Sequence, residues 1–195
     1  YNDFHMGMTG EIIAEKYNIT REESDTMAAW SHTKAARATQ DGKFKEEIYP
    51  ITIERKKKED FIFENDEGIR PDSTAEKLSN LRPVFKDDGL VTAGNASQIT
   101  DGAAAVVVMD KDLAAEHGIK SLGTITGYNT GGVKPELVME APIPTVQKLL
   151  KKLDLTIEDI DLFEHNEAFA SASVAVKNEL NVPDDRFNVH GGAVA

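Results

Sequence analysis

The 195-residue chain contains no cysteine, which excludes disulfides and thiolate metal sites. It has only 22 Lys and Arg against 34 Asp and Glu, a formal net charge of -12. General binding to nucleic acid or to an anionic membrane surface needs a positive field, which this composition lacks. No apolar run approaches the roughly 20 residues that span a bilayer. We therefore expect a cytoplasmic globular protein with no metal site and neither nucleic acid nor membrane as a partner.

The two ends of the chain are unusual. The first residue is Tyr1 and not Met, and no signal peptide is visible. The last residues, 188–195, contain a Gly pair, which is typical of a turn that leads into a further element. We interpret both ends as truncated.

Local patterns predict helices alternating with apolar strands. Thr20 and Glu23 form a capping box that starts a helix ending near Gln40. Apolar spacing and terminal signals predict further helices at 75–79, 112–117, 144–152 and 168–180. Strands are expected at 48–53, 61–63, 103–109 and 123–128, with a strand end at 161–164. The sequence thus predicts the α/β class.

Two of these segments carry sharper expectations. Ala103–Met109 is a continuous apolar run and is expected to form a strand buried on both faces. It follows the irregular polar residues 64–100, so we expect two spatial parts joined near Ser97–Gly102. The charged residues 55–60 suit a solvated hairpin tip, with a phosphate contact as the less favoured alternative.

Two short stretches have the composition of binding loops. Asn166 lies between an expected strand end and a helix, where its amide can face a ligand or cap the helix. Glu167 is then expected in the first helical turn, as a partner of the helix dipole. Five of the seven residues in Val91–Ser97 are small, which suits a loop against which a thin ligand lies, or a tight turn.

Taken together, the motifs resemble the thiolases. The chief matches are NEAFA (Asn166–Ala170), TAGNAS (Thr92–Ser97) followed by DGAAAVVVM (Asp101–Met109), and NVHGGAVA (Asn188–Ala195). Further matches are HMGMTGE (His5–Glu11), REESD (Arg21–Asp25) and LRPVF (Leu81–Phe85). The resemblance covers essentially the whole chain, and the motifs occur in the family's order. NEAF separates the chain from sterol-carrier-type thiolases, and His before Met6 resembles the biosynthetic acetoacetyl-CoA group.

The resemblance implies an architecture and an assembly. The fold would be part of the layered α-β-α sandwich of thiolases, with an inserted loop domain. Residues 1–99 would form the loop domain that covers CoA and makes tetramer contacts. Residues 100–120 would be the last strand and helix of the N-terminal half, and residues 121–195 the start of the C-terminal half. The protein would be a homo-oligomer, either a tetramer or a dimer.

The resemblance also implies a reaction, the reversible Claisen condensation of two acetyl-CoA molecules to acetoacetyl-CoA and CoA. In thiolases a cysteine is acylated, a GHP-motif histidine activates it, and a second cysteine moves a proton. These residues would lie outside this chain, which alone would be inactive. Asn166 would hold a water of the oxyanion hole. CoA would be a substrate, and no cofactor is expected.

Eight residues would contact CoA by the same resemblance. Ser97 would bond the pantetheine arm beside Ala93, and His5 and Met6 would lie near its acyl end. The tunnel wall would be formed by Phe85, Ala168 and Phe169. Arg70 would contact the adenine and phosphate end of CoA. Lys77 replaces a frequent Ser of the family, which puts that contact in doubt. We assign no catalytic role to His190, which is expected to be a packed or capping residue.

Four alternatives remain open from the sequence. The first is a degradative 3-ketoacyl-CoA thiolase, and the second is a non-catalytic CoA-binding or oligomer-forming subunit. The third is another condensing enzyme, such as a ketoacyl-carrier-protein synthase, although those lack the loop domain and have His where NEAF stands. The last is an α/β module without a ligand, because a fold alone does not determine function.

Overall fold

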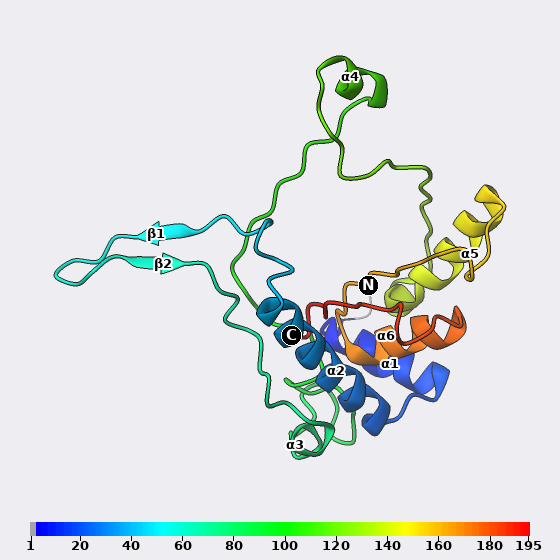
Figure 1. The fold of residues 1–195 in the computed structure, drawn as a ribbon. Helices are drawn as coiled ribbons and strands as arrows, with labels where there is room; N and C mark the ends of the chain where they lie inside the picture. Colours follow the sequence, from blue (N-terminus) through cyan, green and yellow to red (C-terminus); the bar gives the residue numbers. More distant parts are fainter. Residues whose placement is uncertain (1–2) are drawn as a thin grey trace.

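The structure is a computed structural model that describes residues 3–195. Figure 1 shows a body of helices from which two long segments project. The elements in chain order are α1 (Gly7–Tyr17), α2 (Arg21–Gln40), β1 (Ile51–Ile53), β2 (Phe61–Phe63), α3 (Ala75–Ser79), α4 (Lys111–Glu116), the 3-10 helix η1 (Pro135–Glu140), α5 (Pro142–Leu153) and α6 (Ala170–Glu179).

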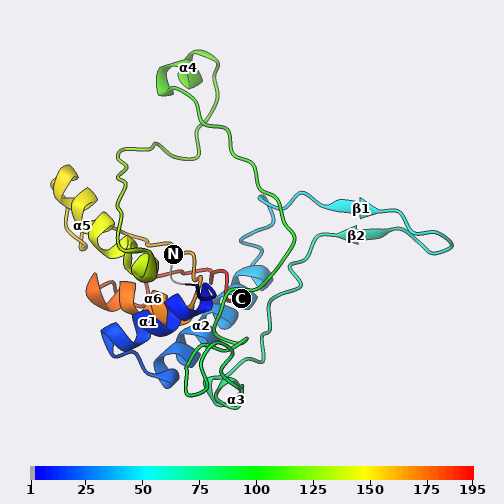
Figure 2. The same ribbon diagram turned by 180° about the vertical axis from the view of Figure 1, so that it is seen from behind.

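Helix α6 forms the centre of the helical body. It packs against α1, α2, η1 and α5, and Figure 2 shows α1, α2 and α6 side by side from behind. Residues 170–176 are all buried, because Ala, Ser and Val are small enough to let neighbouring helices approach on every side. The Ser171 hydroxyl donates to the Gly10 carbonyl at 2.9 Å, which satisfies one polar group inside this core.

The predicted start of α2 is confirmed. The Thr20 hydroxyl accepts a hydrogen bond from the Glu23 N–H at 3.2 Å, and the Glu23 carboxylate accepts the Thr20 N–H at 2.7 Å. Met27 and Ala28 are buried against the core, so the apolar stripe of this helix faces inward as expected. The short helix α3 also begins and ends at the expected residues.

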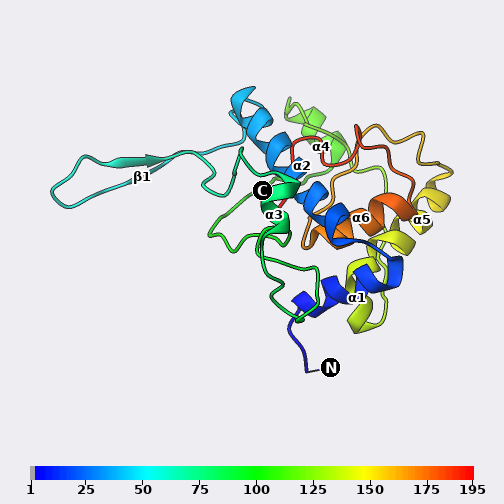
Figure 3. The ribbon, with the colours of Figure 1, turned by 90° about the horizontal axis from the view of Figure 1, so that it is seen from below.

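The predicted hairpin is present but projects into solvent. Strands β1 and β2 are antiparallel, with Ile51 opposite Phe63 and Ile53 opposite Phe61. Figure 3 shows the hairpin extending well away from the helices. Ile51, Ile53 and Phe61 are exposed although they share one face of the hairpin with Phe63. This apolar face has no cover within residues 3–195.

The prediction of a buried strand at Ala103–Met109 is wrong. These residues form no strand, and Val106, Val107 and Val108 are 86%, 91% and 72% exposed. A strand exists only as part of a hydrogen-bonded ladder, and the residues described here offer this segment no neighbouring strand. Instead, the chain after Ser97 leaves the helical body as a long arm with α4 at its tip (Figure 1).

Three further expectations need correction. Gly123–Tyr128 is not a strand, for the same lack of a ladder, and the predicted strand end at 161–164 amounts to one isolated parallel bridge between Phe163 and Phe187. The second spatial part expected after Ser97–Gly102 therefore has no strand core. Helix α6 begins at Ala170, two residues later than predicted, which changes the setting of Asn166 and Glu167.

Helix boundaries elsewhere differ little from the prediction. Helix α5 begins two residues early, at Pro142, and α4 begins at Lys111 after an Asp110 cap. The sequence reasoning missed α1 and η1. Two glycines weaken the helical pattern of α1, but its end at Asn18, in the left-handed conformation, is a recognisable stop signal.

Candidate functional site

Two of the chief family motifs, TAGNAS (Thr92–Ser97) and NEAFA (Asn166–Ala170), lie against one another. Ala96 and Phe169 form an isolated antiparallel bridge, and the Ser97 N–H donates to the Ala168 carbonyl at 3.0 Å. The Ala170 N–H, at the start of α6, donates to the Asn95 carbonyl at 2.8 Å. The backbone of residues 168–170, where the loop enters α6, is therefore paired with the backbone of Asn95–Ser97.

The third motif, at the C-terminal end of the chain, joins the same assembly. The Ala193 N–H donates to the Asn166 carbonyl at 3.2 Å, and the Gln98 N–H donates to the Ala193 carbonyl at 3.0 Å. The Gln98 side chain also donates to the carbonyls of Ala195, at 2.6 Å, and Gly68, at 2.8 Å. Backbone and side-chain hydrogen bonds thus connect residues 92–98, 166–170 and 193–195, which are far apart in sequence, and Ala93, Ser97 and Asn166 are exposed where these segments meet solvent.

Asn166 presents its side chain at this surface. The residue is exposed, and its amide makes no hydrogen bond to another residue within 3–195. The alternative that Asn166 caps the following helix is wrong, because the cap position of α6 is Phe169, which makes no side-chain cap bond. The amide is therefore free to bind a water or a ligand.

Buried polar side chains hold the 90–97 loop rigidly. The Asn95 amide oxygen accepts the Thr92 N–H at 2.8 Å, and its amide nitrogen donates to Asp25 at 2.9 Å. Asp25 in turn pairs with Arg21 at 2.7 Å, and the Glu11 carboxylate accepts the Val91 N–H at 2.8 Å. Since these partners belong to α1 and α2, the loop is fixed to both helices. Its exposed residues, Ala93 and Ser97, are on the outer side.

The aromatic residues expected in the tunnel wall are connected. The His5 and Phe85 rings stack at a centroid distance of 4.7 Å with 15° between their planes. Phe85 and Ala168 pack against a buried cluster that contains Phe169. Met6 is exposed, and together with His5 it lines a hollow of about 470 Å³ that also includes Phe4, Thr9, Pro135 and Glu136.

The predicted phosphate end is not joined to these residues. Arg70 is exposed, and its contact with the helical body is a backbone hydrogen bond, from its N–H to His32 Nδ1 at 3.1 Å. Lys77 is engaged by Asp72, with 2.7 Å between Nζ and Oδ2, and this bond and the lysine charge lower the pKa of Asp72. His190 is exposed and meets the Phe44 ring edge-on at 5.8 Å.

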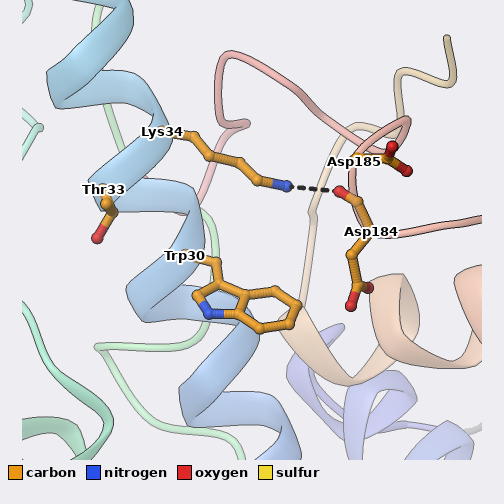
Figure 4. A pocket seen from close by; sticks show the side chains of 5 residues that line it. All are labelled: Trp30, Thr33, Lys34, Asp184 and Asp185. Atoms are coloured by element: carbon orange, nitrogen blue, oxygen red, sulfur yellow. Dashed lines mark hydrogen bonds between the residues drawn. The ribbon is translucent and has the colours of Figure 1, made fainter.

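A second hollow, of about 370 Å³, lies between α2 and the segment after α6 (Figure 4). Lys34 Nζ donates to the carbonyls of Phe187, at 2.8 Å, and Asp184, at 3.3 Å, above the face of Trp30. Lys177 forms an ion pair with Asp184. Lys34 and Asp184 thus have partners within the protein, and these contacts join α2 to the segment after α6. None of the predicted site residues lines this hollow.

Burial gives two histidines pKa values below the ordinary range. His32 is lowered by burial and then by the Arg70 charge, against an opposing effect of Asp72, and His165 is lowered by burial alone. The unfolded chain therefore binds protons more readily at these sites. Their contribution to stability is complete above the ordinary pKa of about 6.5 and is lost as the pH falls toward the folded-state values.

We expect the melting temperature to fall between about pH 7.5 and 5.5, and His32→Gln to reduce that fall. Glutamine keeps an acceptor for the Arg70 N–H but does not titrate. Fluorescence of Trp30, the single tryptophan, reports unfolding. The control is His117→Gln, at an exposed position on the arm. Burial raises the pKa of Glu164, so this carboxyl group makes the folded state more stable as the pH falls. That opposing effect is the same in wild type and in both variants. Equal slopes in wild type and His32→Gln contradict the prediction.

No helix within residues 3–195 is both long and apolar enough to cross a membrane. No group of three or more His, Asp or Glu side chains in the same residues is arranged to hold a metal ion.

Comparison with known families identifies the origin of the motifs. Residues 1–112 match the family described as Thiolase, N-terminal domain, and residues 119–195 match Thiolase, C-terminal domain. The chain belongs to the thiolase family. This confirms the resemblance inferred from the motifs.

Curated relatives match this thiolase chain along its whole length. A protein of Staphylococcus aureus (strain COL) named "Probable acetyl-CoA acyltransferase" is 49% identical over 195 residues, which are 100% of this chain and 50% of the relative. A protein of the same name from Staphylococcus epidermidis (strain ATCC 12228 / FDA PCI 1200) is 47% identical, with the same coverage. The chain spans about half the length of the curated relatives it matches.

Solved thiolase structures share the fold. The Bacillus anthracis acetyl-CoA acetyltransferase superposes with a TM-score of 0.94 at 45% identity, over 99% of this chain and 49% of that one. Human mitochondrial 3-ketoacyl-CoA thiolase gives 0.92 at 42% identity, over 97% and 48%. The predicted α/β class, as part of the thiolase fold, is therefore confirmed. The boundaries predicted at 99 and 120 stay a prediction.

Proposed function

We propose that the chain is part of a thiolase that condenses two acetyl-CoA molecules reversibly to acetoacetyl-CoA and CoA. The observation that carries this proposal is the convergence of three family motifs around the exposed, unbonded amide of Asn166. Because the 195 residues contain no cysteine, the proposal requires the acylated cysteine to lie outside them. The complete enzyme is the protein that contains these 195 residues together with that cysteine.

The proposed chemistry assigns one task to this chain. In the complete enzyme, the cysteine takes the acetyl group from a first acetyl-CoA. The α-carbon of a second acetyl-CoA loses a proton to the second cysteine, which also lies outside this chain, and negative charge develops on the thioester oxygen of that substrate. The resulting enolate carbon attacks the carbonyl carbon of the acyl-cysteine, and the cysteine leaves as a thiolate. A water held by Asn166 donates to the thioester oxygen of the second substrate, and the neutral amide suits this role because it does not titrate.

The proposed CoA path follows the exposed rim of the joined loops. Ser97, whose N–H bonds the Ala168 carbonyl, and Ala93 are both exposed, and they support a pantetheine arm along the outer side of the 90–97 loop. The His5–Phe85 stack and the cluster around Phe169 support an apolar wall. Arg70 supplies an exposed positive charge for the phosphates in a chain of net charge -12. CoA enters as a substrate, with no separate cofactor.

Assembly and compartment are further parts of the proposal. We expect a homo-oligomer, tetramer or dimer, because the hairpin exposes an apolar face formed by Ile51, Ile53, Phe61 and Phe63. The acidic composition and the absence of cysteine favour a cytoplasmic protein.

A degradative 3-ketoacyl-CoA thiolase is the second candidate function. It is favoured by the similarity to the human mitochondrial 3-ketoacyl-CoA thiolase, at 42% identity. Both candidates catalyse the same kind of reversible reaction, so the acyl chain that the site accepts is the property that distinguishes them.

Acyl-chain length tests the two candidates. In the complete enzyme we expect kcat/KM for acetoacetyl-CoA cleavage to exceed that for six- and eight-carbon 3-ketoacyl-CoA substrates by roughly 10-fold or more, since pockets discriminate by about 10–200-fold per methylene. The measurement is CoA-dependent cleavage across the series. Preference for the longer substrates supports the degradative candidate. No turnover with any of them supports a non-catalytic CoA-binding subunit.

A further inference from the structure

Glu167 adopts an unusual backbone conformation directly beside Asn166. Its φ of 60° lies in the left-handed region, which a residue with a side chain rarely occupies, and the residue is only 1% exposed. Such a conformation persists only where the surroundings determine it, and residues of this kind concentrate at functional sites. The sequence placed Glu167 in a helical turn, whereas it precedes α6 by three residues.

The Glu167 carboxylate receives hydrogen bonds from separate parts of the chain. The Ser31 hydroxyl of α2 donates to Oε2 at 2.6 Å, and the Asn188 amide donates to Oε1, also at 2.6 Å. The Gly192 N–H donates to the Ser31 hydroxyl at 3.0 Å and completes a relay. A buried carboxylate is costly unless donors satisfy its oxygens, and here both oxygens have one.

Asn188 holds the residues on both sides of Asn166. Besides binding Glu167, its side-chain oxygen accepts the His165 N–H at 2.6 Å, and its amide donates to the His165 carbonyl at 2.9 Å. Asn188 is itself 1% exposed with a φ of 45°. A single buried amide therefore fixes His165 and Glu167, which bracket the exposed Asn166.

The glycine pair of the C-terminal motif is required by the same packing. A Cβ at Gly192 would overlap the Glu167 carboxyl group, and one at Gly191, where φ is 82°, would lie 2.6 Å from the Ser31 carbonyl oxygen. The two glycines let this segment approach α2 and the carboxylate closely. The motif thus serves to enclose Glu167 as well as to form a turn.

We propose that Glu167, held by Ser31 and Asn188, is a positioning residue that aims the Asn166 amide at the oxyanion water. This inference rests on the proposed function of Asn166. Glu167 is buried and touches no substrate, so it acts through the backbone on either side of Asn166. Small displacements of a catalytic group are costly, because about 1 Å can reduce turnover by 10²-fold.

The test is Glu167→Gln in the complete enzyme. Glutamine keeps the size of the side chain but replaces one acceptor oxygen with a donor, so the bond donated by Asn188 is lost or the one donated by Ser31 must reverse, with the Ser31 hydroxyl turning to the Gly192 carbonyl. We expect kcat for condensation to fall roughly 10–10²-fold with KM for acetyl-CoA nearly unchanged. The burst of CoA that accompanies acylation of the cysteine should be retained, since that step does not use Asn166.

A matched control separates positioning from stability. Ser171→Ala removes another buried hydrogen bond of the core, to the Gly10 carbonyl, and takes away none of the bonds that the Glu167 carboxylate receives. It should lower the melting temperature but leave kcat unchanged. Ser31→Ala, which removes one donor and keeps the carboxylate, should show the Glu167→Gln pattern more weakly and serves where Glu167→Gln does not fold.

The double variant Asn166→Ala, Glu167→Gln decides whether Glu167 acts through Asn166. In the Asn166→Ala background we expect Glu167→Gln to lower kcat by less than about 2-fold, because the residue to be positioned is absent. Additive losses overturn the inference, as does an unchanged kcat in both Glu167→Gln and Ser31→Ala. If Asn166→Ala alone leaves condensation intact, the proposed role of Asn166 fails and the inference fails with it.

Discussion

Asn166→Asp in the complete enzyme should reduce the rate of acetyl-CoA condensation by about 10²–10³-fold while leaving stability almost unchanged. The substitution places a negative charge beside the enolate oxygen and replaces the amide that orders the water. Stability should be spared because the side chain is exposed, makes no hydrogen bond within residues 3–195 and does not cap α6. This arrangement therefore predicts a large fall in the condensation rate with only a small change in melting temperature.

The measurement pairs steady-state condensation rates with melting curves for Asn166→Asp and Asn166→Ala. Asn178→Asp is a suitable control, because it makes the same chemical change at an exposed position near the other end of α6. The control should have normal turnover. Near-normal turnover in Asn166→Asp would remove Asn166 from the catalytic machinery, whatever the acyl-chain preference of the enzyme.

Local sequence signals predicted the local structure of this chain well. The capping box of Thr20 and Glu23 involves neighbouring residues only, and the structure has both of its bonds. The apolar residues on either side of the charged residues 55–60 likewise predicted the hairpin, since β1 and β2 pair with each other, although β1 covers only Ile51–Ile53 of the strand expected at 48–53. In both cases every group needed for the element is present within a few residues.

Elements that depend on distant partners were predicted poorly. Ala103–Met109 has the composition of a buried strand, but its burial depends on strands on either side, which the described residues do not supply. For Glu167, in contrast, the distant partners are present in the described residues, but the sequence did not reveal them. Its sequence position suggested a dipole partner, whereas its bonds to Ser31 and Asn188 span 136 and 21 residues and could not be read from local spacing. Only the resemblance, which assigned Asn166 and Ser97 to one substrate site, indicated that distant segments lie close together.

The 195-residue chain by itself should cleave no acetoacetyl-CoA above a boiled control. The proposed reaction proceeds through an acyl-cysteine, and the chain has no cysteine to acylate. Because covalent catalysis divides one difficult step into two, its loss should remove measurable turnover altogether. The assay follows acetoacetyl-CoA consumption in the presence of CoA, with Trp30 fluorescence showing that the sample is folded.

The strongest rival nucleophile is Ser173, whose hydroxyl lies 2.9 Å from His165 Nδ1. A serine beside an imidazole can be activated, and burial lowers the pKa of His165, which favours the neutral ring that a general base requires. Ser173 is nevertheless 0% exposed inside α6, so no thioester carbonyl can reach its oxygen. Turnover by the chain that disappears in Ser173→Ala would show that this helix opens to substrate, and would replace the cysteine mechanism proposed here.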